Sequence, residues 1–318
     1  MKVSKLEKNL IKVCLKFNIG KLESYNKELS NQNNVYKVVT DKGIFIIKEF
    51  TKDAIGNYYY LTKRKKQLMI AKKLNDNGIS CAIPKVINKG HFFLLNNRYY
   101  LVYEYNKASC IDEKDYTLTH IKVISQIQAK IHKLNLQAKL PCVYKKINID
   151  IDELLRKGKK HPDFYNYLEE NKDKLFNLIN ICNDNISKMK ENLCISHNDY
   201  KMKNILWEKL KPTLIDFDAS GMANPTCCMA ESALNFSLNE SSYDYDKYKV
   251  YLESYIAAYG KVKENYKEVL FCCMNGKLQW YNYLISKKNF DNIYGMTKDL
   301  IMYYDNIEKF YNIYKSIY

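Results

Sequence analysis

The spacing of apolar residues changes near residue 105, and this change limits the possible folds more than any other feature of the chain. Residues 35–50 (VYKVVTDKGIFIIKEF) form two β-rich runs around a DKG turn, where glycine tolerates the positive φ of a tight turn. Pro84 opens a second such stretch, in which two β-rich runs flank the asparagine pair at 96–97. Beyond residue 105 the spacing becomes helical. The sequence therefore predicts a strand-rich first third and a mainly helical remainder.

Helical patterns occupy one segment of the first third and most of the second part. Between residues 58 and 77 leucines recur at helical spacing, and Gly78 supplies a stop. An isoleucine series from 124 to 131 marks a later helix, and residues 150–192 carry further helical patterns. Two short β-like patches lie within 205–217. We expect an α+β fold in which a small antiparallel sheet with one main helix precedes a larger, mainly helical part.

Composition limits the classes of partner and of cellular environment. The net charge is +16, yet only three of the 51 basic residues are arginine, the residue favoured for phosphate contacts, so we expect no nucleic-acid partner. The ten cysteines include no C-x-x-C pair and none at metal-ligand spacing, and we expect buried thiols. No segment approaches the roughly eighteen uncharged apolar residues of a membrane span. We therefore expect a reduced, cytoplasmic protein without a membrane partner.

The most informative stretch for chemistry is SHNDYKMKN, which runs from Ser196 to Asn204. It has the form H-x-D-x-x-x-x-N, and an apolar strand that ends in Asp216 (LIDFD) follows twelve residues later. This combination suits phosphoryl transfer, in which catalysis is mostly positioning and charge neutralisation around Mg²⁺. The spacing therefore indicates a kinase-like centre.

Each residue of this centre has a chemical role that fits its type. Asp199, on a loop, can accept the proton of an attacking hydroxyl. Asn204 can offer a neutral oxygen to a hard cation, and Asp216 can supply the anionic ligand that bridges Mg²⁺ to the β- and γ-phosphates. We expect His197 to orient the loop rather than to act as a base. The sequence thus predicts Asp199 as the catalytic residue, with Asn204 and Asp216 as metal ligands.

This segment resembles the catalytic and metal-binding loops of the aminoglycoside phosphotransferase and choline kinase group, which are small-molecule kinases of the protein-kinase-like fold. The similarity runs through HNDYKMKNILW and IDFDASGMANP, and it extends to bacterial phosphotransferase-family members and spore-coat kinase-like proteins. At the level of motifs it covers residues 195–236, while the order of elements fits most of the chain. The resemblance implies two lobes, a nucleotide-binding lobe over 1–104 and a catalytic and acceptor-binding lobe over 105–318.

The resemblance also implies nucleotide contacts in the first lobe. Lys48 ends an apolar strand and stands where these kinases place the lysine that grips the α- and β-phosphates. The run from Ser30 to Asn34 would form the turn that covers the phosphates, although it lacks a glycine-rich stretch. The residues that fall where the hinge would contact adenine are Tyr103, Glu104 and Tyr105.

Two departures from the family pattern stand out. The lysine usually pairs with a glutamate on the following helix, but residues 50–103 contain no glutamate, and Gln67 lies at about the expected place. Without that carboxylate Lys48 would lose a charge-assisted partner worth about 1.5–3 kcal/mol, unless Asp53 or another acid compensates. The family usually has an acidic residue about three positions after the Asn-Pro pair, where this chain has Cys228. We expect the second departure to affect local structure more than chemistry.

The leading hypothesis is a Mg²⁺-dependent kinase that transfers a phosphoryl group from ATP, or GTP, to a hydroxyl of an aminoglycoside-like or other small molecule. A cationic acceptor would need an acidic pocket, and choline-like, sugar and amino-acid alcohols stay open as acceptors. The oligomeric state is also left open. The acids available downstream for such a pocket are Asp218, Glu231, Glu240, Asp244 and Asp246.

The alternative hypothesis is a catalytically silent or weak kinase-like protein with a structural role, as in a spore coat. The missing helix glutamate and the glycine-poor phosphate turn favour it, whereas the intact Asp199, Asn204 and Asp216 oppose it. A protein kinase ranks third, because the chain has neither a D-F-G nor an A-P-E element.

Overall fold

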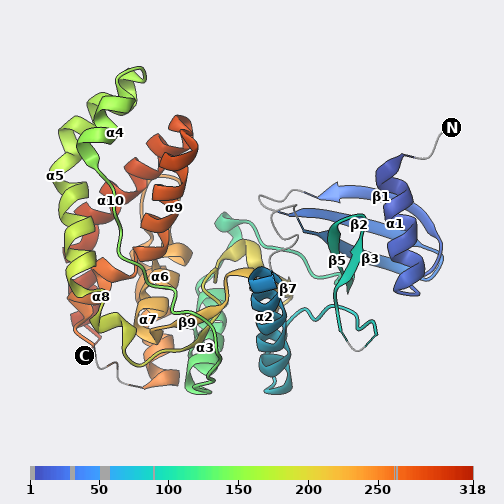
Figure 1. Cartoon of the computed structure of the whole chain (residues 1–318). Coiled ribbons are helices and arrows are strands. Elements are labelled where there is room, and N and C mark those ends of the chain that lie inside the picture. Colours follow the sequence, from blue (N-terminus) through green and yellow to red (C-terminus); the bar gives the residue numbers. More distant parts are fainter. Residues whose placement is uncertain are drawn as a thin grey trace. The chain divides into compact units, whose positions relative to one another are not determined.

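The computed structural model describes residues 4–28, 33–50, 58–88, 90–260, 262 and 264–317. The chain divides into two compact units. Unit 1 comprises Met1–Cys110 and Asn204–Asp218, and unit 2 comprises Ile111–Lys203 and Ala219–Tyr318. Figure 1 labels the elements of both. This division groups residues 105–110 and 204–218 with the N-terminal part, whereas the sequence suggested a single boundary after residue 104. The assignment of nucleotide binding and catalysis to separate lobes stays a prediction.

Unit 1 contains the antiparallel sheet that the sequence predicted. Its strand order is β1-β2-β3-β5-β4, and neighbouring strands are antiparallel. The β2–β3 turn is followed by Gly43 at φ 131°, and the β4–β5 turn uses two asparagines with φ 47° and 57°, which are values that favour glycine and asparagine. The strands are β1 (Leu22–Glu28), β2 (Asn34–Thr40), β3 (Gly43–Glu49), β4 (Phe93–Leu95) and β5 (Arg98–Glu104).

Two helices of unit 1 pack on opposite faces of this sheet. Helix α1 (Lys5–Lys16) contributes to a core formed with alternate residues of β2, β3 and β5, including Ile47 and Val102. The next residues of the same strands point to the other face, where Leu68 of α2 (Tyr58–Asp76) packs against Leu101 and its neighbours. The predicted helix is confirmed as α2, while α1 and β1 were not among the predicted elements.

A second, smaller hairpin joins unit 1 from far along the chain. It consists of β7 (Ile205–Glu208) and β8 (Lys211–Leu214), where the sequence shows β-like patches. Main-chain hydrogen bonds join Leu214 to residues 80 and 82, and Trp207 pairs with Ser109. These bridges explain why residues 204–218 group with the N-terminal unit.

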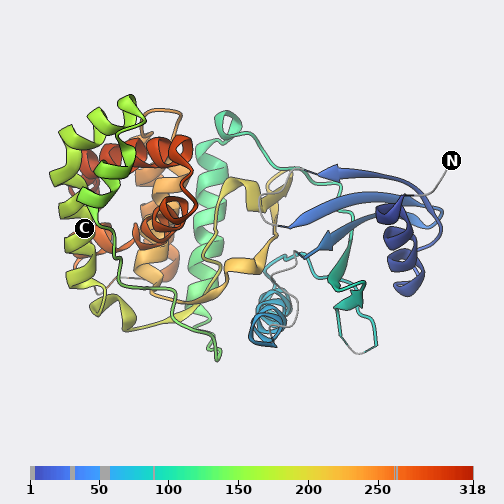
Figure 2. The same ribbon diagram turned by 45° about the horizontal axis from the view of Figure 1, so that its top comes forward.

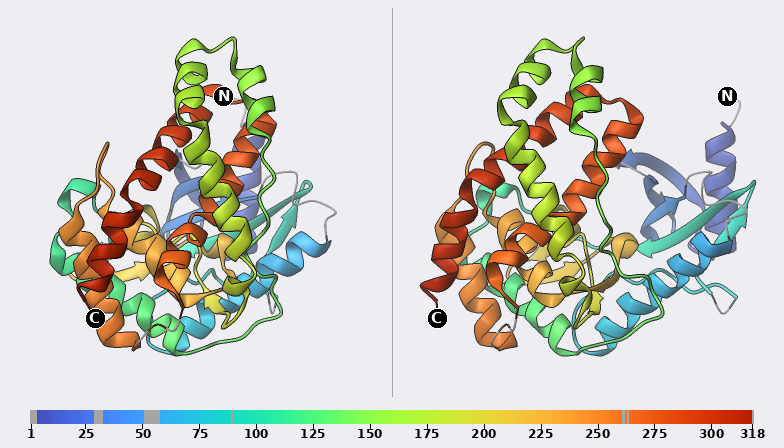
Figure 3. Two further views of the ribbon diagram at one scale, coloured as in Figure 1. Left: turned by 90° about the vertical axis from the view of Figure 1, so that its left-hand side faces the viewer. Right: turned by 60° about the vertical axis from the view of Figure 1, so that its left-hand side comes forward.

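Unit 2 is mainly helical, as predicted. Helix α3 packs along α7, and α5 packs along α10 (Figures 2 and 3). A short ladder of β6 (Cys194–Ser196) and β9 (Gly221–Ala223) lies next to α3 and α6. The helices are α3 (Leu118–Lys133), α4 (Ile151–Gly158), α5 (Pro162–Asn185), α6 (Pro225–Ser237), α7 (Tyr245–Tyr259), α8 (Tyr266–Cys272), α9 (Asn275–Lys287) and α10 (Phe290–Lys315).

The structure bears on two expectations about environment. All ten cysteines are free, and eight of them are buried, in line with the expected buried thiols. Among the described residues no helix is long and apolar enough to cross a membrane.

Candidate active site

The predicted site residues divide between the two units. Lys48, Asn204 and Asp216 belong to unit 1, and Asp199 belongs to unit 2. The residues of each unit are described separately below. Ser30 and Asp53 lie outside the described residues.

Lys48 is the centre of a charged cluster in unit 1. Its Nζ lies 2.9 Å from Asp216 Oδ1 and 2.7 Å from Asp218 Oδ2. Burial alone would lower the pKa of Lys48, but the two carboxylates outweigh it and raise the pKa above its ordinary value. Lys48 therefore stays charged, and it has carboxylate partners although α2 provides no glutamate.

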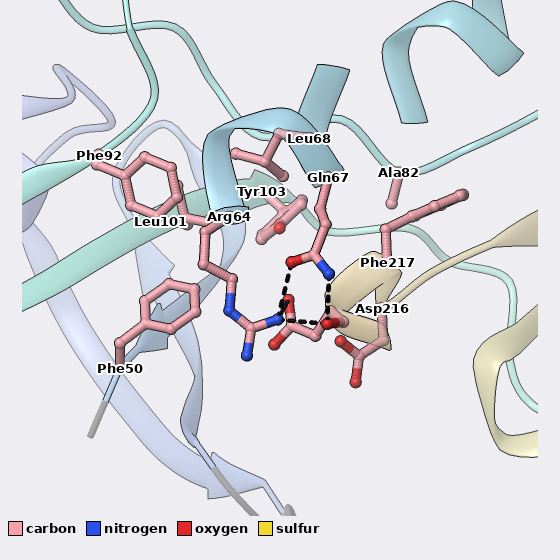
Figure 4. Close-up of a pocket in the computed structure, with 11 residues that line it drawn as sticks. Phe50, Arg64, Gln67, Leu68, Ala82, Phe92, Leu101, Tyr103, Asp216 and Phe217 are labelled. Carbon is pink, nitrogen blue, oxygen red and sulfur yellow. Dashed lines mark hydrogen bonds and ion pairs between the residues drawn. The ribbon is translucent and has the colours of Figure 1, made fainter. Parts of the chain in front are cut away.

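The carboxylate and main chain of Asp218 are held from several sides. Its carboxylate accepts from Lys48 and from Asn33 Nδ2 (3.2 Å), and it forms an ion pair with Arg64 (3.3 Å). Its main-chain oxygen accepts from Arg64 Nη1 (2.6 Å) and Gln67 Nε2 (2.7 Å). The Gln67 side chain in turn accepts from Arg64 through Oε1 (3.1 Å). Figure 4 shows the side chains of Arg64 and Gln67 extending from α2 with their polar ends close together.

Arg64 is itself held by aromatic side chains. Its guanidinium lies 4.7 Å from the ring centroid of Tyr60 and 6.0 Å from that of Phe50, and Nη2 donates to Tyr60 Oη at 2.9 Å. Such stacking fixes the plane of the guanidinium. One turn of α2 thus presents a fixed cation and an amide to residue 218.

A pocket in unit 1 adjoins this cluster (Figure 4). One part of its wall is apolar and the other is formed by the charged and amide side chains just described. Burial raises the pKa of Tyr103, which also lines it. The lining residues are Phe50, Arg64, Gln67, Leu68, Ala82, Phe92, Leu101, Tyr103, Asp216, Phe217 and Asp218.

The two predicted metal ligands lie at the same end of the β7–β8 hairpin. Ile205 pairs with Leu214, so Asn204 precedes the first strand directly opposite Ile215, whose N–H donates to the Asn204 carbonyl at 3.0 Å. Asp216 follows at φ 59°, a left-handed conformation that asparagine and aspartate tolerate better than most residues. The turn brings both ligand residues to one edge of unit 1.

The donor chemistry of this edge fits Mg²⁺. One carboxylate and one amide oxygen are hard ligands, and Mg²⁺ is usually held by one or two carboxylates together with substrate phosphates rather than by an all-protein cage. The Asp216 side chain is 43% exposed, so a solvated cation can reach it. Among the described residues no group of three His, Cys, Asp or Glu could hold a metal by itself. The site therefore suits a metal that arrives with a phosphate ligand.

Asp199 lies in unit 2 on the loop that follows β6. Its carboxylate lies 3.2 Å from Lys201 Nζ and 3.5 Å from Lys203 Nζ. Its N–H donates to His197 Nδ1 at 3.4 Å, and His197 is buried, as expected for a residue that orients the loop. The residue between them, Asn198, has φ 60° and donates through Nδ2 to the Ala219 carbonyl at 3.3 Å.

A buried histidine supports the strand that leads into this loop. His132 of α3 shares hydrogen bonds with Ser196 Oγ through Nε2 (3.0 Å) and with Tyr255 Oη through Nδ1 (2.6 Å). Burial lowers the pKa of His132 to about 3, so the imidazole is neutral at physiological pH. These hydrogen bonds across unit 2 indicate a structural role for His132.

A second pocket lies within unit 2, beside the loop that carries Asp199. His197, Asn198 and Tyr200 line one side, and Gln128 of α3 and Glu231 of α6 line another. Burial raises the pKa of Glu231, although Lys201 and Lys277 oppose this shift.

The remaining residues predicted to contact the nucleotide are Asn34, Glu104 and Tyr105. Asn34 donates to Glu49 Oε1 at 3.0 Å, and it is the preceding Asn33 whose side chain reaches Asp218. Glu104 is exposed and pairs with Lys85 at 3.0 Å, while Tyr105 is also exposed. Their contacts with a nucleotide stay predictions.

Two of the downstream acids have local roles in the structure. Asp218 binds Lys48 and Arg64, and Asp244 caps α7 by accepting from the N–H groups of residues 246 and 247. Of the five acids, Glu231 is the one that lines the pocket beside the loop that carries Asp199.

Comparisons with known proteins agree with this architecture. Residues 26–267 match the Phosphotransferase enzyme family, so the chain belongs to that family. An amicoumacin kinase solved with AMP-PNP, Ca²⁺ and Ami is 14% identical, with 96% of this chain and 94% of that chain covered and a TM-score of 0.69. Spectinomycin phosphotransferase APH(9)-Ia, solved with ADP and spectinomycin, is 12% identical, with coverage of 95% and 98% and a TM-score of 0.67.

A third solved structure, the choline kinase LicA from Streptococcus pneumoniae, is 17% identical, with 96% of this chain and 99% of that chain covered and a TM-score of 0.61. None of the curated proteins matches the chain. At these identities the structural likenesses establish the fold: the α+β, kinase-like architecture predicted from the sequence is confirmed.

Proposed function

We propose that this protein is a Mg²⁺-dependent kinase that transfers the γ-phosphoryl group of ATP, or of GTP, to a hydroxyl of a small molecule. The observation that carries the proposal is the cluster in unit 1, where Lys48 lies 2.9 Å from Asp216 at the hairpin end that also carries Asn204. Membership of the Phosphotransferase enzyme family supports the reaction class.

Each predicted site residue has a separate role in the proposed reaction. Lys48 binds the phosphates, and Asn204 and Asp216 hold Mg²⁺, which neutralises charge on the phosphate oxygens when bound. Asp199 accepts the proton of the attacking hydroxyl. The ion pairs of Lys48 weaken the alternative of a silent, structural protein, because the missing helix glutamate has not left this lysine without a carboxylate.

On the acceptor side we propose that Glu231 contacts the substrate. It lines the pocket formed with the loop residues His197 and Asn198, and burial raises its pKa. A carboxyl group there can accept a hydrogen bond from a substrate hydroxyl or pair with a substrate amine. This fits an aminoglycoside-like acceptor and also sugars and amino alcohols.

The test is transfer of labelled γ-phosphate from ATP or GTP, with Mg²⁺, to a panel of amino sugars, sugars and amino alcohols. Asp199→Asn should lower the transfer rate by about 10²–10⁴-fold, because it removes the proton acceptor. The control is Asp184→Asn, the same change on an exposed residue of α5. Transfer that is absent in the wild type for every acceptor, or equal in wild type and Asp199→Asn, would contradict the proposal.

A further inference from the structure

The two carboxylates bound to Lys48 differ in their surroundings. The side chain of Asp216 is 43% exposed, whereas that of Asp218 is 24% exposed. Asp218 also accepts from Asn33 and pairs with Arg64. A carboxylate with three such partners has little capacity left for a metal ion, while the more exposed carboxylate can exchange its contact with Lys48 at low cost.

The main chain of residue 218 is fixed as well. Arg64 and Gln67 both donate to its carbonyl oxygen, at 2.6 Å and 2.7 Å, and both belong to the same turn of α2. Stacking on Tyr60 and Phe50 keeps the Arg64 guanidinium in place. The helix therefore controls the position of Asp218 through two side chains.

From this geometry we propose that Asp218 is the positioning residue of the site. Arg64 and Gln67 form a clamp that holds Asp218, and Asp218 holds Lys48 in place, so that Asp216 can exchange Lys48 for the cation. The proposal rests on the proposed kinase function. Asp218 then pairs with Lys48 in place of a carboxylate on α2. The helix contacts the lysine indirectly, because Arg64 and Gln67 bind Asp218.

The clamp requires an amide at position 67. Gln67 donates to the Asp218 carbonyl through Nε2 and accepts from Arg64 through Oε1, so both ends of the amide are used. A glutamate would offer no donor to that carbonyl and would place a negative charge beside Asp218. If Gln67 were only a weak substitute for a glutamate that pairs with Lys48, Gln67→Glu would strengthen nucleotide binding. The clamp predicts the opposite.

The experiment is calorimetric titration of a non-hydrolysable ATP analogue at several Mg²⁺ concentrations. Asp218→Asn should raise the Kd about tenfold, as expected for the loss of a hydrogen bond to a charged group. Gln67→Glu should raise the Kd as well, because it removes the amide donor to the Asp218 carbonyl and adds a negative charge beside Asp218. In Asp218→Asn the Mg²⁺ concentration needed for half-maximal binding should also rise, because Lys48 then pairs with Asp216 alone. The control is Asp76→Asn, the same change on an exposed residue at the end of α2.

A double-mutant cycle separates positioning from a merely structural role. If Asp218 acts through Lys48, Asp218→Asn should change the Kd less than about twofold in a Lys48→Met background. Thermal unfolding of each variant without nucleotide identifies any that fails to fold. If Asp218→Asn does not fold, the nucleotide affinity of Gln67→Glu tests the proposal instead.

The outcomes separate the inference from the function on which it rests. A wild-type protein that does not bind the analogue at all contradicts the proposed function. A wild type that binds, with Asp218→Asn unchanged, with additive effects in the cycle, or with tighter binding in Gln67→Glu, overturns the positioning role alone.

Discussion

Adjacent residues of β3, Lys48 and Glu49, each centre a buried group of charges, one on either face of the sheet. On the α1 face Glu49 pairs with Arg98 at 2.8 Å and accepts from Asn34 at 3.0 Å and from Tyr100 at 2.7 Å. Its side chain is only 5% exposed. These partners of Glu49 all lie in the same sheet, and Tyr100 also accepts from Asn9 of α1 at 3.4 Å. We call this buried group the closed network.

On the α2 face the charged side chains of the Lys48 cluster differ in how exposed they are. Lys48 is 11% exposed, Asp218 24% and Asp216 43%. Both faces contain a largely buried charged residue with charged partners, so burial of charge does not by itself identify the functional face. The difference is that the network on the α2 face includes Asp216, a carboxylate that solvent can reach and that follows a hairpin beside Asn204, the other predicted metal ligand.

The largest effect on stability should come from breaking the closed network. Glu49→Gln leaves Arg98 without its buried carboxylate and should cost about 3 kcal/mol in the free energy of unfolding, the low end for a buried pair because Arg98 is itself 28% exposed. The Kd for Mg²⁺-nucleotide should stay within about twofold of wild type, because hydrogen bonding on the α1 face does not set the position of Lys48. Denaturant unfolding and calorimetry measure the two quantities.

The control for that variant is Glu169→Gln, since Glu169 is exposed and pairs with Lys172 on α5. An exposed pair should contribute less than about 1 kcal/mol. If Glu49→Gln weakened nucleotide binding much more than it weakened folding, the assignment of separate roles to the two faces would be wrong.

A pH titration tests whether His132 of unit 2, which is buried as Glu49 is, contributes to stability through its protonation state. The pKa of His132 is about 3 in the folded protein, and an unfolded histidine has a pKa of about 6.5. The unfolded state therefore binds a proton that the folded state does not, and stability is lost as pH falls below about 6.5. At pH 5 the loss from this residue alone should be about 2 kcal/mol.

The measurement is the free energy of unfolding at pH 7 and pH 5 for wild type and His132→Gln, with His161→Gln as the exposed control on the surface of unit 2. The pH dependence should shrink in the first variant and persist in the second. An identical dependence in wild type and His132→Gln would show that other groups cause the loss.

The smallest effect on stability should come from the open network. Asp216→Asn leaves Lys48 paired with Asp218, and the residue replaced is substantially exposed, so the free energy of unfolding should change by less than about 1 kcal/mol. The variant should nevertheless lose the stabilisation that Mg²⁺ and ATP give together, about 2.7 kcal/mol at 100 times the Kd. Thermal unfolding with and without both ligands measures this. Retained metal-dependent stabilisation would refute the ligand role of Asp216.

Much of the fold could be predicted because its signals are local. The turns that follow Thr40 and Leu95, and the helix ended by Gly78, each depend on residues adjacent in the chain. The sequence missed β1, most of which is exposed, so its apolar pattern is weak. It also missed α1, although the buried Leu10, Val13 and Cys14 recur at the spacing of an amphipathic helix.

The site could be predicted only where its spacing lies within one segment. The motif named Asn204 and Asp216, and the structure places them at the same end of a hairpin, while their role as metal ligands stays a prediction. The partners of Lys48 were missed because Asp218 lies 170 positions away, and Arg64 carries no signal that separates it from other helical cations. The sequence noted the absent helix glutamate but not what replaces it, since that depends on the contact between α2 and residue 218.

The assignment of residues 204–218 to unit 1 has a consequence for how the molecule can be divided. The backbone passes from one unit to the other three times, after residues 110, 203 and 218. Two of these crossings directly adjoin the predicted metal ligand Asn204 and the clamped Asp218. A fragment that ends at residue 110 would lack the hairpin that completes its own unit. Neither unit is therefore a continuous piece of chain, and exchange of one unit between related proteins would require three junctions, two of them at the edge of the site.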